Sequence, residues 1–158
     1  MQLRRIEREV AALADISDIL DRCEVGHLGV TDTEGPYVVP LSFVHVVRDE
    51  RIVVYAHGAA VGRKIAAIGS DPRVCFEAEI RIRTIVTSDV TDLSVAYESV
   101  VGSGTARIVT DAAEARTALA LLIEKYVPGR GDELPAKLPP VAVLAFDLDA
   151  VMGKHNLG

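Results

Sequence analysis

In residues 73–83 every second side chain is apolar, and the side chains between them are charged except for that of Cys75. This period of two is typical of a β-strand with one buried and one open face, because successive side chains point to opposite sides of a pleated chain. Residues 95–109 predict another long strand, in which Gly102 and Gly104 permit a bulge, a bend or close backbone approach. The sequence therefore predicts a protein built on a β-sheet.

Turn-forming residues divide the region before these strands into two hairpins. A strand at residues 27–31 is followed by a polar turn at 32–35 and by a long apolar run at 37–47. A second turn at 48–50 leads into a strand at 51–57. Two successive hairpins predict an antiparallel meander.

In three other segments, apolar residues recur every three to four positions, which is the spacing of a helix. The first begins near Asp15, whose carboxylate is placed to cap the amides that follow, and the second spans residues 59–69. The third begins at Asp111, with Glu114 at the spacing of a capping box. The apolar faces of these helices consist of Ile16, Ile19, Leu20 and Cys23; of Val61, Ile65 and Ile68; and of Ala115, Ala118, Leu119, Leu122 and Tyr126.

Irregular segments at 84–94 and 127–140 separate the later elements, and a last strand is predicted at 141–148. Antiparallel strands and peripheral helices without strand–helix alternation predict a mainly β protein, and a curled sheet of this size commonly forms a barrel, which removes exposed edges. The sequence lacks the Gly-x-Gly-x-x-Gly turn of a Rossmann-type fold. We expect residues 1–158 to form a single domain, a small antiparallel barrel.

The composition limits the partners and the compartment. The net charge is −6 at pH 7, whereas a protein that binds nucleic acid usually presents a basic face. No apolar run approaches the ~20 residues of a membrane span, and the N-terminus lacks the apolar core of a signal peptide. Cys23 and Cys75 have neither the spacing of a zinc site nor the density of a disulfide scaffold. We expect a cytoplasmic protein without a metal site, which binds neither nucleic acid nor membrane.

The segment 55–65 carries the clearest candidate for a ligand site. A strand is expected to end at His57, Gly58 gives the chain freedom to turn, and a helix follows. The amides and the dipole at a helix N-terminus attract anions, and Lys64 borders the apolar stripe, from where it can reach a phosphate. Arg63, rotated by ~100° around the helix, is the weaker candidate. The alternative is an ordinary surface lysine beside an ordinary arginine.

A proline interrupts the strand pattern within residues 35–43. Pro40 has no amide hydrogen, so its strand must lie at a sheet edge or carry a bulge. The unpaired backbone groups beside it suit the rim of a planar heteroaromatic ring, and Ser42 adds a hydroxyl group. The alternative is that Pro40 only protects an edge from aggregation.

Tyr97 and Ser99 share one face of their strand, near the glycines noted above. They offer two hydroxyl groups; the alternative is two half-exposed side chains on a sheet surface. Among the histidines, only His57 stands out, through its place at the predicted anion site. No Ser-His-Asp set and no pair of catalytic carboxylates is recognisable, which is typical of a protein that leaves its chemistry to a cofactor.

Five segments, in their order and spacing, resemble the pyridoxamine 5′-phosphate oxidase-related family of FMN-binding split barrels, in its Nim-type nitroimidazole-resistance branch. They are residues 26–43, 55–65, 71–77, 97–106 and 152–154, which together span nearly the whole chain. The resemblance implies a homodimer with FMN in a groove at the subunit interface. The chain shows no match to the C-terminal substrate-binding region of the oxidase itself, so vitamin B6 oxidation is not expected.

The resemblance also implies which residues contact the cofactor. These are, for the phosphate, His57, Gly58 and Lys64; for the ring, Pro40, Leu41 and Ser42; and, as a hydroxyl pair, Tyr97 and Ser99. The function expected is that of an FMN-dependent oxidoreductase acting on a small nitroaromatic or quinone-like acceptor, with His57 or Tyr97 as the proton donor. The alternatives are a barrel that binds haem or deazaflavin, and a flavin carrier or sensor without catalysis.

Overall fold

The computed structural model describes residues 5–138 and 140–158. The strands are β1 (Glu9–Val10), β2 (Gly26–Asp32), β3 (Gly35–Leu41), β4 (Phe43–Arg48), β5 (Arg51–Ala59), β6 (Arg73–Ile85), β7 (Ser94–Ile108) and β8 (Val141–Asn156). The helices are α1 (Leu13–Arg22), α2 (Arg63–Ser70) and α3 (Ala112–Tyr126), with short 3-10 turns η1 (Ile6–Arg8), η2 (Val90–Asp92) and η3 (Gly131–Glu133). None of the helices described is long and apolar enough to cross a membrane.

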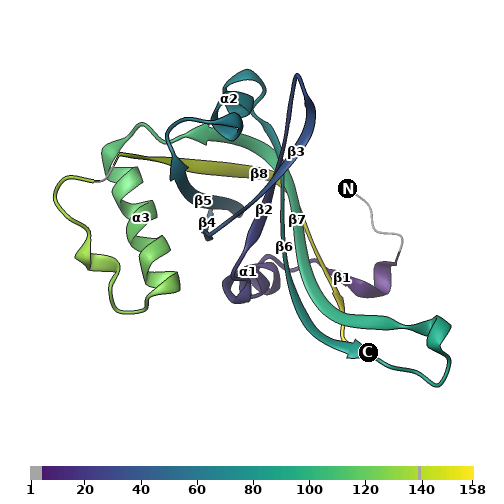
Figure 1. Cartoon of the computed structure of the whole chain (residues 1–158). Coiled ribbons are helices and arrows are strands. Elements are labelled where there is room, and N and C mark those ends of the chain that lie inside the picture. The colour runs from purple at the N-terminus through teal and green to yellow at the C-terminus, as the bar shows by residue number, and fades with distance from the viewer. Residues whose placement is uncertain (1–4, 139) are drawn as a thin grey trace.

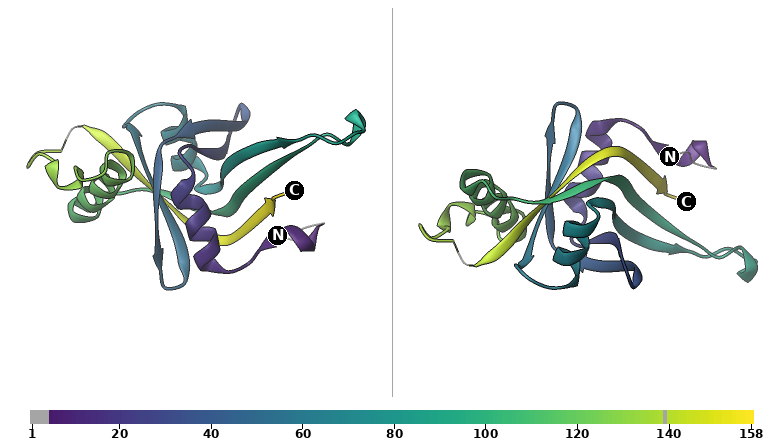
Figure 2. Two further views of the ribbon diagram at one scale, coloured as in Figure 1. Left: turned by 90° about the horizontal axis from the view of Figure 1, so that it is seen from below. Right: turned by 90° about the horizontal axis from the view of Figure 1, so that it is seen from above.

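The strands form one antiparallel sheet in the order β3-β2-β6-β7-β8-β5-β4, and β1 pairs with β8. The two edge strands, β3 and β4, are joined in sequence through Ser42, but no ladder connects them in the part of the chain described. The sheet curls strongly, and the β6–β7 hairpin extends beyond it to η2 (Figures 1 and 2). The predicted mainly β, antiparallel split-barrel architecture with peripheral helices is confirmed, with a sheet that curls but does not close.

Apolar side chains fill the inside of the curled sheet. The inward residues of β6 include Phe76, whose ring lies 5.0 Å from that of Phe43 in an edge-on arrangement and 6.1 Å from that of Phe146. The apolar faces of α1 and α2 pack against the same interior. This interior fixes the register of the strands that line it, because a shift by one residue would turn their apolar side chains outward.

A second apolar layer lies between α3 and the outer face of β4, β5 and β8, on the left of Figure 1. Asp111 caps α3 as predicted, since its carboxylate accepts a hydrogen bond from the amide of Glu114 at 2.7 Å. The carboxylate of Glu114 accepts instead from Arg107 at 2.7 Å and from the hydroxyl of Tyr55 at 2.6 Å. These contacts lower the pKa of Glu114 to about 2 and fasten the start of α3 to the sheet.

Two helices begin elsewhere than predicted. Helix α1 starts at Leu13, and Asp15 makes no cap but lies in the first turn, where its charge favours the helix dipole. Helix α2 starts only at Arg63, because β5 continues to Ala59. The turn is made by Gly62, whose φ of 122° is available to glycine and strained for other residues, and not by Gly58, which remains in the strand.

Three strands also differ from their predicted bounds. The apolar run at 37–47 is broken at Ser42, and its two halves lie at opposite edges of the sheet. Strand β8 continues to Asn156, because its second half pairs with β7 and β1. The alternation of β6 ends at a bulge between Arg81 and Arg83, which leaves Ile82 exposed.

Candidate functional site

The ammonium group of Lys64 lies directly over the backbone of Gly58. A Cβ atom built on Gly58 would be only 2.7 Å from Nζ of Lys64, so a side chain there would displace the ammonium group. Lys64 forms no ion pair with any carboxylate of the residues described. The first amides of α2 follow Gly62 and have no partner in a preceding helical turn. A cation that has no carboxylate partner among the described residues, on the helix that these amides begin, fits the phosphate of a nucleotide cofactor.

Arg63 has a different environment from its neighbour. Its guanidinium group donates to the carboxylate of Asp32 at 2.7 and 3.0 Å, and it lies over the ring of Tyr37 at 4.6 Å. The hydrogen bond with Arg63 lowers the pKa of Asp32, and the same bond raises the pKa of Arg63. Arg63 is therefore already neutralised, which agrees with its ranking below Lys64 as a phosphate ligand.

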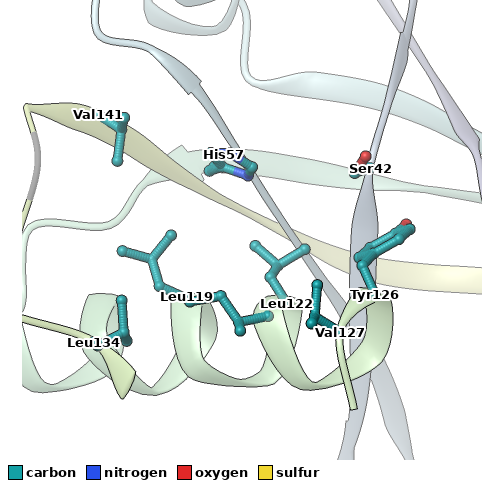
Figure 3. A pocket seen from close by; sticks show the side chains of 9 residues that line it. Ser42, His57, Leu119, Leu122, Tyr126, Val127, Leu134 and Val141 are labelled. Atoms are coloured by element: carbon teal, nitrogen blue, oxygen red, sulfur yellow. The ribbon is translucent and has the colours of Figure 1, made fainter. Parts of the chain in front are cut away.

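His57 points to the other face of β5, away from Lys64. It follows Tyr55 on the face that α3 covers, whereas Gly58 and the ammonium group above it lie on the opposite face. On the α3 side, His57 and Ser42 line one cavity of about 390 Å³ (Figure 3). The structure thus brings together His57 and Ser42, and separates both from the predicted phosphate site.

The other two residues assigned to the flavin ring lie on β3. Pro40 pairs with His27 in this edge strand, as the missing amide hydrogen requires, and its side chain is exposed. The side chain of Leu41 packs against the interior core, so that only its backbone faces the edge. Any contact of Leu41 with a ligand must therefore be made by main-chain atoms.

Tyr97 and Ser99 lie on the outward face of the β6–β7 hairpin. They line a groove of about 410 Å³ together with Glu77, Glu79 and Arg81, and this groove shares no residue with the cavity at His57. Within one chain, the predicted hydroxyl pair is therefore separate from the other candidate site residues.

Close packing against β8 explains why β7 carries glycine at two positions. A Cβ atom on Gly102 would lie 2.6 Å from Cδ1 of Leu148, and one on Gly104 would lie 2.0 Å from the carbonyl oxygen of Asp147. The close approach that these glycines indicated in the sequence is therefore that of β8 across a bulged ladder.

Sequence reasoning missed the contribution of α3 and the segment after it. The residues of this region that line the cavity at His57 are Leu119, Leu122, Ile123, Tyr126, Val127 and Leu134. The hydroxyl of Tyr126 accepts from the amide of Phe43 at 2.9 Å and donates to the carbonyl of Glu24 at 2.7 Å, which fixes the end of α3 near the β3–β4 junction. The helical stripe predicted only that this face is buried; that it leaves a cavity depends on the tertiary arrangement.

Solved structures with the same fold come from several bacteria. The Azotobacter vinelandii flavocytochrome Anf3 aligns with 99% of this chain and 73% of its own at a TM-score of 0.84 and 20% identity. A FAD and heme binding protein from Mycobacterium smegmatis aligns with 96% of this chain and 74% of its own, at 0.83 and 20%. A proposed 5-nitroimidazole antibiotic resistance protein from Bacteroides thetaiotaomicron aligns with 93% and 86%, at 0.75 and 25%. Comparison with curated protein sequences gave no match.

A family model supplies the assignment that these structural likenesses leave open. The model described as pyridoxamine 5′-phosphate oxidase matches residues 13–155, which run from the start of α1 almost to the end of β8. The match includes the β3–β4 junction, the β5–α2 turn and the β6–β7 hairpin, which carry the candidate site residues. The chain therefore belongs to the pyridoxamine 5′-phosphate oxidase family.

Proposed function

We propose that the protein binds FMN and acts as an oxidoreductase on a small nitroaromatic or quinone-like acceptor. The observation that carries this proposal is the ammonium group of Lys64, which lies over Gly58 and has no carboxylate partner within residues 5–138 and 140–158. A single unpaired cation suits the one phosphate group of FMN. Two proteins of similar structure are a flavocytochrome and a FAD and heme binding protein, which supports a flavin as the cofactor.

The residues of the chain have distinct tasks in this proposal. Lys64 and the first amides of α2 hold the phosphate, and the main chain of the edge strand at Pro40 and Leu41 offers hydrogen-bonding groups to the ring. Bound flavin supplies the two-electron couple that the side chains themselves lack. His57 stands at the mouth of an apolar cavity, where its imidazole can pass a proton to an acceptor that is being reduced.

We further propose a homodimer in which the outward face of the β6–β7 hairpin meets a second copy. A row of side chains crosses five strands on this face, consisting of Pro40, His27, Glu77, Val101 and Met152. No helix among the described residues packs on its outer side. A second copy bound there would bring its own Tyr97 and Ser99 to the interface, where they could contact the flavin bound to the first copy. Tyr97 is therefore a second candidate proton donor.

A cytoplasmic location belongs to the same proposal. Cys23 is buried and Cys75 is exposed, and both are free thiols. Free thiols are typical of a reducing compartment.

The proposal is tested by the visible absorption spectrum of the purified protein, recorded before and after FMN is added. We expect a flavin spectrum in the native chain and an FMN affinity reduced about 10- to 100-fold in Lys64→Ala, because a charge-assisted hydrogen bond contributes about 1.5–3 kcal/mol. Lys137→Ala, which removes an exposed lysine elsewhere, is the matched control. A Soret band would instead indicate haem, and equal affinities in both variants would contradict the phosphate site.

A further inference from the structure

The cavity beneath α3 is walled almost entirely by apolar side chains. Its nine lining residues include no aspartate, glutamate, lysine or arginine, and its volume of about 390 Å³ lies in the usual range of small-molecule sites. The hydroxyl of Tyr126 is already engaged with main-chain groups, so this residue presents its ring. The polar group left to a ligand is the imidazole of His57, because the hydroxyl of Ser42 is hydrogen-bonded to that of Tyr126.

These two polar groups lie together on the sheet side of the cavity. Figure 3 shows His57 and Ser42 above the row of leucine and tyrosine side chains of α3. The imidazole of His57 forms no hydrogen bond within residues 5–138 and 140–158. The cavity therefore has one apolar wall and one edge that offers hydrogen bonds.

The outer wall of the cavity is held in place by side chains of α3 that face away from it. The guanidinium group of Arg116 donates to the carbonyl oxygens of Pro135 at 2.7 Å and Ala136 at 2.8 Å. The carboxylate of Glu124 accepts from the amides of Gly129 at 2.9 Å and Gly131 at 3.0 Å. Because the segment after α3 is tied to the helix at both places, it is kept from collapsing onto the sheet, and the cavity stays open.

We propose that this cavity binds an uncharged, flat ring compound that has a hydrogen-bond-accepting oxygen at one end. The ring would lie against the leucines of α3, and the oxygen would accept a hydrogen bond from the imidazole of His57. This inference deepens the proposed function. That the bound compound is the electron acceptor rests on the proposed function, whereas binding of the compound in the cavity requires no flavin. It also excludes a phosphorylated occupant such as pyridoxamine 5′-phosphate, because no cation lines the wall.

The chain contains no tryptophan, so a single introduced indole reports binding without background. Val127→Trp places it at the rim of the cavity, and Val86→Trp places it on the distant β6–β7 hairpin as a matched control. Menadione is the uncharged probe, and a sulfonated naphthoquinone is the charged one. Equilibrium dialysis of the unaltered protein with menadione shows whether the new indole itself blocks the cavity.

In flavin-free protein we expect menadione to quench Val127→Trp saturably, at one molecule per chain, and to quench Val86→Trp only linearly. The sulfonated compound is expected to bind at least about tenfold more weakly, because its charged group would lose its hydration against apolar side chains. Adding Leu134→Glu to the reporter is expected to weaken menadione binding by a similar factor, whereas Leu157→Glu, an exposed leucine near the C-terminus, leaves it unchanged.

Three results would overturn the inference: linear quenching of both reporters together with no retention in dialysis, equal binding of the charged and uncharged probes, or displacement of menadione by FMN one for one. The last result would assign the cavity to the flavin ring. If menadione binds but FMN does not, the proposed function fails and the cavity assignment stands. If FMN binds but menadione does not, the proposed FMN site stands and the cavity assignment fails.

Discussion

His45 is the only histidine or charged residue of the described chain that is buried, and its environment makes the stability of the fold sensitive to pH. Its Nε2 atom lies 2.7 Å from the hydroxyl of Ser17, whereas its Nδ1 atom is buried without a hydrogen-bond partner. Burial lowers the pKa of His45 below its ordinary value of 6.5; Asp21 opposes this shift and Lys125 adds to it. The folded chain therefore resists a proton that the unfolded chain accepts.

The stability that depends on neutral His45 is accordingly present above a pH of about 6.5 and is lost as the pH falls below that value. Urea unfolding at neutral and at mildly acidic pH measures this loss. We expect the free energy of unfolding to fall more steeply in the native chain than in His45→Gln, which has no titrating ring. The same fall in both proteins would show that other groups cause it.

At the level of elements, the contact between β7 and β8 depends on the absence of side chains. Gly104→Ala would place a Cβ atom 2.0 Å from a main-chain oxygen of β8, and a backbone atom cannot move away at low cost. We expect this substitution to destabilise the fold by about 3 kcal/mol, as strong overpacking does.

Gly69→Ala is the matched control, since the new methyl group would meet no atom within 4 Å and would lie in α2. It is expected to leave stability unchanged or to raise it by up to about 1 kcal/mol, because alanine favours a helix over glycine. Thermal unfolding of the two variants decides the matter, and similar melting temperatures would contradict the packing described for β7 and β8.

The elements also show what local sequence can and cannot predict. The alternation at 73–83 identified β6, because consecutive side chains of a strand point alternately into the core and to the outside. The break at Ser42 and the extension of β8 to Asn156 were not predictable, because both depend on which strand lies alongside. The site divides in the same way: Gly58 and Lys64 meet through a local turn and were predicted together, whereas the cavity at His57 is made by α3, which lies some sixty residues further along the chain.

For the whole molecule, the separation of Tyr97 from His57 and Lys64 is the main argument for a second copy. Val101→Glu would place a charge in the middle of the proposed interface, and we expect it to convert a dimer into a monomer in size-exclusion chromatography with light scattering. Val61→Glu changes a valine that is 78% exposed on the β5–α2 connection and should leave the dimer intact. A monomeric native chain would contradict the interface directly.

His57 is proposed to link the flavin to the acceptor cavity, and the reoxidation of bound, reduced FMN by menadione tests this role. In the absence of oxygen, we expect one menadione to reoxidise one flavin, and His57→Ala to slow this step by about 10²-fold or more, the usual contribution of a proton donor, while FMN affinity stays unchanged. If the bound flavin is not reoxidised, or if His57→Ala reacts as fast as the native protein, His57 does not link the flavin to the cavity as its proton donor.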